Sequence, residues 1–181
     1  QKQKGIQDNM AAVKANTANR QLEGGDANAA AAAYRDALKL EPDNAKIYYN
    51  LALALDRAGD RAGEREALEK SIALDPKLAL PQNQIGLLDL QDGNLAKAEG
   101  ELKNALSLDP QYAEAQNNLG VLYGRLGRNQ EAEKLFRQAV EDNPQYAQAF
   151  VNLGLTLDSQ NRFPEAKKEL ETAIGIAPSN A

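Results

Sequence analysis

Five side-chain amides recur in this sequence at a spacing of 34 residues, at Asn16, Asn50, Gln84, Asn118 and Asn152. An amide side chain donates and accepts hydrogen bonds at the same time. A column of amides can therefore bond the backbone of an extended peptide without reading its side chains, at roughly 0.5–1.5 kcal/mol for each bond. The chemistry that this column offers is the recognition of a peptide.

The composition argues against catalysis and metal binding. The chain has no His and no Cys, which excludes imidazole bases, thiol nucleophiles, zinc sites and disulfides. Its 26 Asp and Glu residues fall on helix faces that we expect to be exposed or in Asp-Pro turns, and there is no Gly-rich phosphate loop. We therefore expect no enzyme activity in these residues and no cofactor or metal.

Charge and hydropathy restrict the partners that the chain can bind. The net charge is −5 without a basic run, so nucleic acid and anionic membranes are poor partners on electrostatic grounds. No stretch approaches the roughly 20 apolar residues that a membrane span requires. We expect a protein or peptide partner.

Five prolines share the spacing of the amides, and most of them end a similar motif, such as Leu40-Glu41-Pro42. A period without drift indicates one repeated supersecondary unit, stacked along the chain. With the proline at position 32, the repeats are 11–44, 45–78, 79–112, 113–146 and 147–180, preceded by an extension of the first helix over residues 1–10. We expect residues 1–181 to form one elongated domain. The prolines are Pro42, Pro76, Pro110, Pro144 and Pro178.

Each repeat reads as two helices separated by a break. In the fourth repeat, apolar residues at helical spacing run from Leu119 to Leu126, stop at Gly127 and resume from Ala132 to Val140. Gly tolerates the left-handed backbone just past a helix end, and a following Asp or Asn can cap the next helix. The pattern predicts ten helices in antiparallel pairs. The breaks are Gly25-Asp26, Gly59-Asp60, Gly93-Asn94, Gly127-Arg128 and, with Asn in place of Gly, Asn161 followed by Pro164.

The repeat resembles that of the tetratricopeptide repeat family. The fourth repeat lacks the usual bulky residue at position 4, where it has Gln116, but it carries the family's Leu119-Gly120, Tyr123, Ala132, Phe136, Ala139 and Pro144. The resemblance covers nearly the whole chain. It implies an all-α fold, an α-solenoid of five tandem helix-turn-helix repeats that form a right-handed superhelical stack. It also implies a function in protein–protein interaction.

In this family the first helix of each repeat lines a concave groove, so the resemblance places the amide column in that groove. Tyr49 and a second column then add apolar surface, and an apolar patch in a groove often marks a binding site. Two alternatives stay open: the apolar residues pack between first helices as additional core, and the amides are a common family feature rather than a working ladder. The second column is Asn19, Leu53, Leu87, Val121 and Leu155.

Three departures from the family pattern carry further expectations. Glu64 and Asp89 occupy positions that usually hold a small and an aromatic residue, and we expect both to be paired or turned toward water because an unpaired buried carboxylate costs several kcal/mol. Residues 1–24 place Lys14 and Thr17 where core residues are usual, which predicts an N-terminal cap with a polar outer face. The last repeat shows no such cap.

The sequence therefore favours a non-catalytic scaffold that binds a peptide segment of a partner in its concave groove. One alternative is a self-assembly module, a homo-oligomer that forms through the uncapped C-terminal face. Another is a recruitment domain cut from a larger enzyme.

Overall fold

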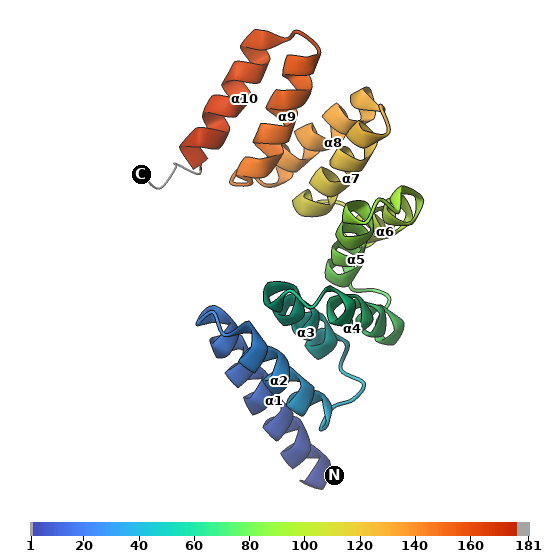
Figure 1. Ribbon diagram of the computed structural model, residues 1–181, viewed down its shortest axis with the longest axis vertical. Helices are drawn as coiled ribbons and strands as arrows, with labels where there is room; N and C mark the ends of the chain where they lie inside the picture. The colour runs from blue at the N-terminus through green and yellow to red at the C-terminus, as the bar shows by residue number, and fades with distance from the viewer. Residues whose placement is uncertain (1, 177–181) are drawn as a thin grey trace. The chain divides into compact units, whose positions relative to one another are not determined.

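The computed structural model describes residues 2–176, and these form ten α-helices and no strand (Figure 1). The all-α fold is confirmed, and Pro178 lies outside the described residues. Helices pack as hairpins, α1 with α2, α3 with α4, α7 with α8 and α9 with α10. The helices are α1 (Lys2–Glu23), α2 (Ala27–Leu38), α3 (Ala45–Ala58), α4 (Arg61–Leu74), α5 (Ala79–Gln91), α6 (Leu95–Leu108), α7 (Ala113–Arg125), α8 (Asn129–Asp142), α9 (Ala147–Ser159) and α10 (Phe163–Ile176).

The chain divides into two compact units, Gln1–Ile85 and Gly86–Ala181, with the boundary inside α5. The N-terminal unit holds α1 to α4 and the first half of α5, and the C-terminal unit holds the rest. The organisation of residues 1–181 as a single domain stays a prediction.

Residues with a left-handed backbone follow the first helices, as the breaks in the sequence predict. Gly59 has φ 77° and Gly127 has φ 74°, a region that side chains disfavour. In the fifth repeat Asn161 takes φ 61° at the same place. Helix α10 then begins at Phe163, and Pro164 lies in its first turn, where a missing N–H costs nothing.

The caps predicted for the second helices are correct at two positions and wrong at a third. The carboxylate of Asp26 accepts a hydrogen bond from the N–H of Ala29, and that of Asp60 accepts one from Gly63, each at 2.9 Å. Asn94 makes no such cap bond. Its amide instead donates to Oδ1 of Asp89 at 3.0 Å, because this buried carboxylate needs a donor.

Small residues set the distance between the two helices of a repeat. A Cβ placed on Gly120 would lie 2.6 Å from the ring of Phe136, and one on Gly154 would lie 2.7 Å from Leu170. The first helix thus lies directly against the large side chain of the second. The same pairing recurs in the third repeat, where a Cβ on Gly86 would meet Leu102 at 2.8 Å.

Neighbouring repeats complete each other's core. In the C-terminal unit one cluster of buried residues joins Leu102 of α6, Leu122 of α7 and Leu153 of α9, with Phe136 of α8 in the same cluster. A smaller cluster brings together Ala113, Ala139 and Ala149, so α8 is buried on one side by its own repeat and on the other by the next. The core of this unit is therefore shared between repeats.

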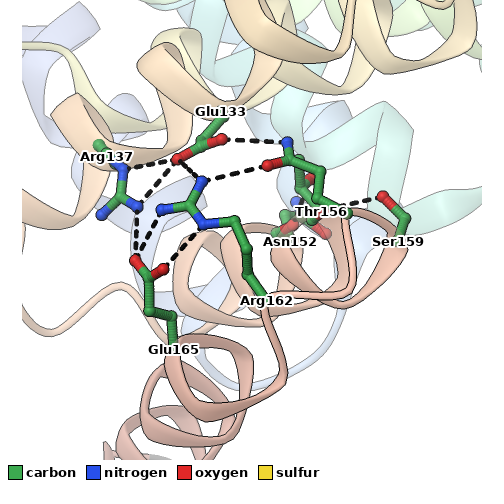
Figure 2. Close-up of polar contacts among 8 residues, drawn as sticks. Glu133, Arg137, Asn152, Thr156, Ser159, Arg162 and Glu165 are labelled. Carbon is green, nitrogen blue, oxygen red and sulfur yellow. Dashed lines mark hydrogen bonds and ion pairs between the residues drawn. The ribbon is translucent and has the colours of Figure 1, made fainter.

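A network of charges also joins consecutive repeats (Figure 2). Arg162, just before α10, reaches back to Glu133 of α8 at 2.8 Å and also pairs with Glu165. Arg137 contacts both carboxylates, at 2.9 Å and 3.4 Å. Burial by itself would raise the pKa of Glu133, but hydrogen bonds from Gln160, Arg162 and Arg137 hold that pKa below its usual value. Glu133 is therefore ionised at neutral pH.

The same arrangement occurs one repeat earlier. Glu99 of α6 pairs with Arg128 at 3.3 Å, accepts a hydrogen bond from the hydroxyl of Tyr123 at 3.1 Å and is flanked by Lys103. The guanidinium of Arg128 lies 3.7 Å from the centre of the Tyr123 ring. Glu99 and Arg128 lie 34 residues before Glu133 and Arg162, so the charges repeat in register.

The two carboxylates that depart from the family pattern are both buried and both paired, as expected. Glu64 accepts a hydrogen bond from the amide of Gln84 at 3.1 Å, and Asp89 has Asn94 at 3.0 Å and Lys97 at 3.8 Å. Burial raises the pKa of Glu64, against the opposing hydrogen bond from Gln84. Folding therefore makes this side chain easier to protonate than it is in the unfolded chain.

The polar outer face predicted for residues 1–24 is wrong in part. Ala11 and Ala18 of α1 are buried, but Ile6, Met10 and Val13 are 60%, 50% and 59% exposed. These three residues follow helical spacing and form an apolar stripe on α1. The prediction considered only the positions of the repeat that are usually buried, and it overlooked the outward residues.

Replacing Gly120 by Ala is expected to destabilise the protein by about 1–3 kcal/mol, because the new methyl group overlaps the buried ring of Phe136. Gly124 of the same helix has open space around it, so Gly124→Ala is expected to stabilise the helix by up to about 1 kcal/mol. Urea unfolding of the two variants measures both effects. Equal shifts in the same direction would contradict the packing described.

Glu64→Gln is expected to raise the stability at pH 7, because it removes a buried charge and keeps an acceptor for Gln84. The pKa of Glu64 is raised on folding, so its favourable contribution is present below the unfolded value of 4.5 and is lost as the pH rises through the raised value. The advantage of the variant should therefore shrink on acidification. Thermal unfolding between pH 4 and pH 8 checks this, and a variant less stable than the parent at pH 7 refutes it.

Candidate peptide-binding surface

The faces predicted to bind a peptide lie on α1, α3 and the first half of α5 in the N-terminal unit. Asn16 of α1 is exposed, and Asn50 of α3 is half-buried. Gln84 is also half-buried, but its amide donates to the buried Glu64. Of the three predicted amides in this unit, one is therefore engaged within the fold.

A hollow of about 330 Å³ lies between α3 and the start of α5. Two predicted residues, Tyr49 and Asn50, line it together with Leu80, which is 48% exposed. The hollow is mostly apolar, since Leu78, Ala79 and Pro81 complete its wall, and two lysines border it, Lys46 and Lys77. A shape of this kind suits one apolar side chain of a partner.

A second hollow, of about 240 Å³, lies between α1 and α3. Three predicted residues line it, Asn19 of α1 and Asn50 and Leu53 of α3. The hydroxyl of Tyr34 donates to Asn19, and Arg57 donates to the carbonyl oxygen of Leu22 at 3.2 Å. Asn50 borders both hollows, so its amide is placed to bond a segment that spans them.

In the C-terminal unit one predicted amide, Asn152, bonds across to the neighbouring first helix. The amide of Asn152 donates to Asn117 at 2.7 Å, and Asn117 in turn donates to the hydroxyl of Tyr146 at 3.3 Å. Asn118 is buried. This polar network joins α7 to α9, and a peptide would have to compete with it for the same groups.

In the same unit the residues of the apolar column differ in their exposure to solvent. Leu87 and Val121 are half-buried and pack against the core cluster. For these two residues the structure therefore agrees with the alternative stated above, that the apolar column packs as additional core. Leu155 of α9 is 57% exposed and is available for contact. The column thus contributes both to the core and to the surface.

The sequence analysis overlooked Asn117, Lys77 and Leu78. Asn117 precedes the predicted Asn118 by one residue, and its role in the buried network depends on a tyrosine 29 residues away. Lys77 and Leu78 lie in the turn between repeats, where the family pattern places no groove residue. No other repeat has a lysine at this turn position, so Lys77 could have been recognised from the sequence as a departure from the repeat.

Among the described residues neither a cluster of metal ligands nor a membrane-spanning helix is found. Among residues 2–176 no group of three or more acidic side chains is arranged to hold a metal ion. None of the described helices combines the length and the apolar character needed to cross a membrane. Each unit has its own candidate surface, the two hollows in the N-terminal unit and the surroundings of the exposed Leu155 in the C-terminal unit.

Comparison with solved structures places the fold among known repeat proteins. PilF of Pseudomonas aeruginosa matches with a TM-score of 0.86 at 18% identity, over 96% of this chain and 79% of that one. MamA of Desulfovibrio magneticus RS-1 matches with a TM-score of 0.76 at 19% identity, over 94% and 96%. YrrB, a tetratricopeptide protein described as having an unusual peptide-binding site, matches with a TM-score of 0.67 at 24% identity, over 92% and 86%. These likenesses confirm the solenoid fold.

Comparison with curated protein sequences gives no match. Four models of tetratricopeptide repeats match the chain, over residues 18–59, 45–78, 77–142 and 120–181. Successive matches overlap or adjoin and cover the chain from residue 18 onward, in agreement with the glycine and proline positions of the repeats. The chain belongs to the tetratricopeptide repeat family.

Proposed function

We propose that the chain is a non-catalytic scaffold that binds a peptide segment of a partner protein on its first helices. Tetratricopeptide proteins are typically protein-interaction scaffolds without catalytic activity. The observation that carries the proposal is the hollow beside α3, where an amide, an aromatic ring and an exposed leucine come together at Asn50, Tyr49 and Leu80. The peptide-binding site of the similar protein YrrB supports the same type of ligand.

The contacts suggest how each part of the site would act. Each unit offers its own apolar contact for a peptide side chain, Leu80 in the N-terminal unit and Leu155 in the C-terminal unit, which are 48% and 57% exposed. The amide of Asn50 would bond the peptide backbone. Leu87 and Val121 would act through the core, by supporting the face rather than touching the peptide.

Leu80→Asp and Leu155→Asp are each expected to weaken peptide binding about ten-fold or more, because each places a charge where an apolar side chain would be buried. Peptides selected from a random displayed library on the immobilised protein, with Kd measured by fluorescence anisotropy, provide the test. Both leucines are exposed, so circular dichroism should show unchanged helicity.

Leu108→Asp is the matched control, since Leu108 is also exposed but ends α6, a second helix. Its affinity should equal that of the parent. If the control loses binding while both first-helix variants keep it, the peptide binds elsewhere and the proposal fails.

Self-assembly is a second candidate, favoured by the apolar stripe of α1. Ile6, Met10 and Val13 line a hollow of about 410 Å³, and Ile174 of α10 is 67% exposed. Sedimentation velocity over a concentration series is expected to show association of the parent and a monomer for Val13→Asp. A parent that stays monomeric at millimolar concentration excludes this candidate.

A further inference from the structure

The hollow between α3 and α5 is bordered by two positive charges. Its wall is apolar, and among residues 2–176 no carboxylate lines it. Lys46 of α3 and Lys77 of the following turn both border it. Within the described part of the chain neither ammonium group is paired with a carboxylate. The hollow thus combines an apolar wall with two cations that have no partner within the described residues, in a chain of net charge −5.

The start of α5 adds to the positive potential. The helix begins at Ala79, and its first turn contributes Ala79, Leu80 and Pro81 to the hollow. That turn contains no acidic residue, so the positive end of the helix dipole is not neutralised there. The potential at the hollow therefore has two sources, the lysines and the helix terminus.

The pair of lysines is particular to this junction between repeats. Lys46 is at position 2 of the second repeat and Lys77 at position 33. The first, third and fourth repeats hold at these two positions Ala12 with Asp43, Leu80 with Gln111, and Glu114 with Gln145. The lysines are thus a feature of one site rather than of the repeat.

Two carboxylates of the protein lie near the lysines, and one of them is engaged in a turn. Asp43 and Asp75 line a neighbouring hollow, which Lys46 also borders. The carboxylate of Asp75 accepts a hydrogen bond from the backbone N–H of Lys77 at 3.0 Å, so it caps the turn. Neither aspartate forms an ion pair with Lys46 or Lys77 within the described part of the chain, so both ammonium groups can still pair with carboxylates of a partner.

We propose that this hollow binds an apolar side chain that is flanked in the partner by carboxylates, as in an Asp-Phe-Asp segment. The apolar side chain would lie on Tyr49, Leu78 and Leu80, and the carboxylates would pair with Lys46 and Lys77. This inference rests on the proposed function and names the chemistry of its ligand. Charge complementarity selects this class of segment over a basic one.

The test uses three synthetic peptides with blocked ends and the ¹⁵N-labelled protein. The first has the sequence Gly-Asp-Phe-Asp-Gly-Ser, the second has Lys in place of both Asp, and the third has Ala in place of Phe. Titrations followed by amide chemical shifts at Tyr49, Leu78 and Leu80 should give a Kd for the first peptide at least ten-fold lower than for the other two. Raising the salt concentration should reduce the ratio between the Kd values of the lysine peptide and the aspartate peptide, because salt screens the charges.

Charge reversal gives the decisive comparison. The double variant Lys46→Glu/Lys77→Glu should prefer the lysine peptide over the aspartate peptide. The control Lys134→Glu/Lys168→Glu makes the same change in net charge at two exposed positions on α8 and α10, and it should keep the preference of the parent. Equal affinity of the parent for the acidic and basic peptides, or no shift at the hollow at millimolar peptide, would overturn the inference.

This failure is distinguishable from a failure of the proposed function. If the short acidic peptide does not bind while a library-selected peptide does and is sensitive to Leu155→Asp, the hollow chemistry is wrong and the scaffold function stands. If no peptide of either kind binds, both are wrong.

Discussion

Within each of the last three repeats, a residue without a side chain lies opposite a large one. Gly120 meets the ring of Phe136, and Gly154 meets Leu170, with no room for a methyl group between them. This close approach buries one side of the second helix, and the first helix of the next repeat buries another side, as the cluster of Ala113, Ala139 and Ala149 shows. Exposed apolar residues remain on two first helices, at Leu80 of α5 and Leu155 of α9.

Polar contacts fix the register of the stack. The ion pairs of Glu99 with Arg128 and of Glu133 with Arg162 occupy equivalent positions one repeat apart. Surface ion pairs usually contribute less than about 1 kcal/mol each, so their main effect is to disfavour slipped arrangements rather than to hold the repeats together. In the N-terminal unit a buried pair, Glu64 with Gln84, replaces them, and there the raised pKa of Glu64 records the cost of burial.

The sequence predicted the helices well because their ends depend on local chemistry. Gly59 and Gly127 have positive φ and follow first helices, and Asn161 does the same without being glycine. The prediction that the Asn94 side chain caps α6 was wrong because this side chain bonds the buried Asp89, a residue of the preceding helix. Backbone conformation near a turn can be inferred from neighbours in sequence, whereas a choice between two hydrogen-bond partners cannot.

The candidate site was less predictable for the same reason. The position of Asn152 and Gln84 within the repeat assigns both residues to the predicted binding face. It does not reveal that the side-chain amide of Asn152 already donates to Asn117 and that of Gln84 to Glu64. It likewise does not separate Leu155, which is exposed, from Val121, which packs on the core. These distinctions depend on side chains 20 and 35 residues away that bond the amides, and on the packing of other repeats.

Hydrogen exchange measured by NMR on a variant with Leu153→Ala and Leu157→Ala in α9 tests most directly whether repeats depend on one another. Both leucines belong to the buried cluster that includes Phe136 of α8. The account predicts that amides of α8 lose protection together with those of α9 and α10, because α8 depends on the next repeat for part of its burial. Wild-type protection throughout α8, with loss confined to α9 and α10, would contradict it.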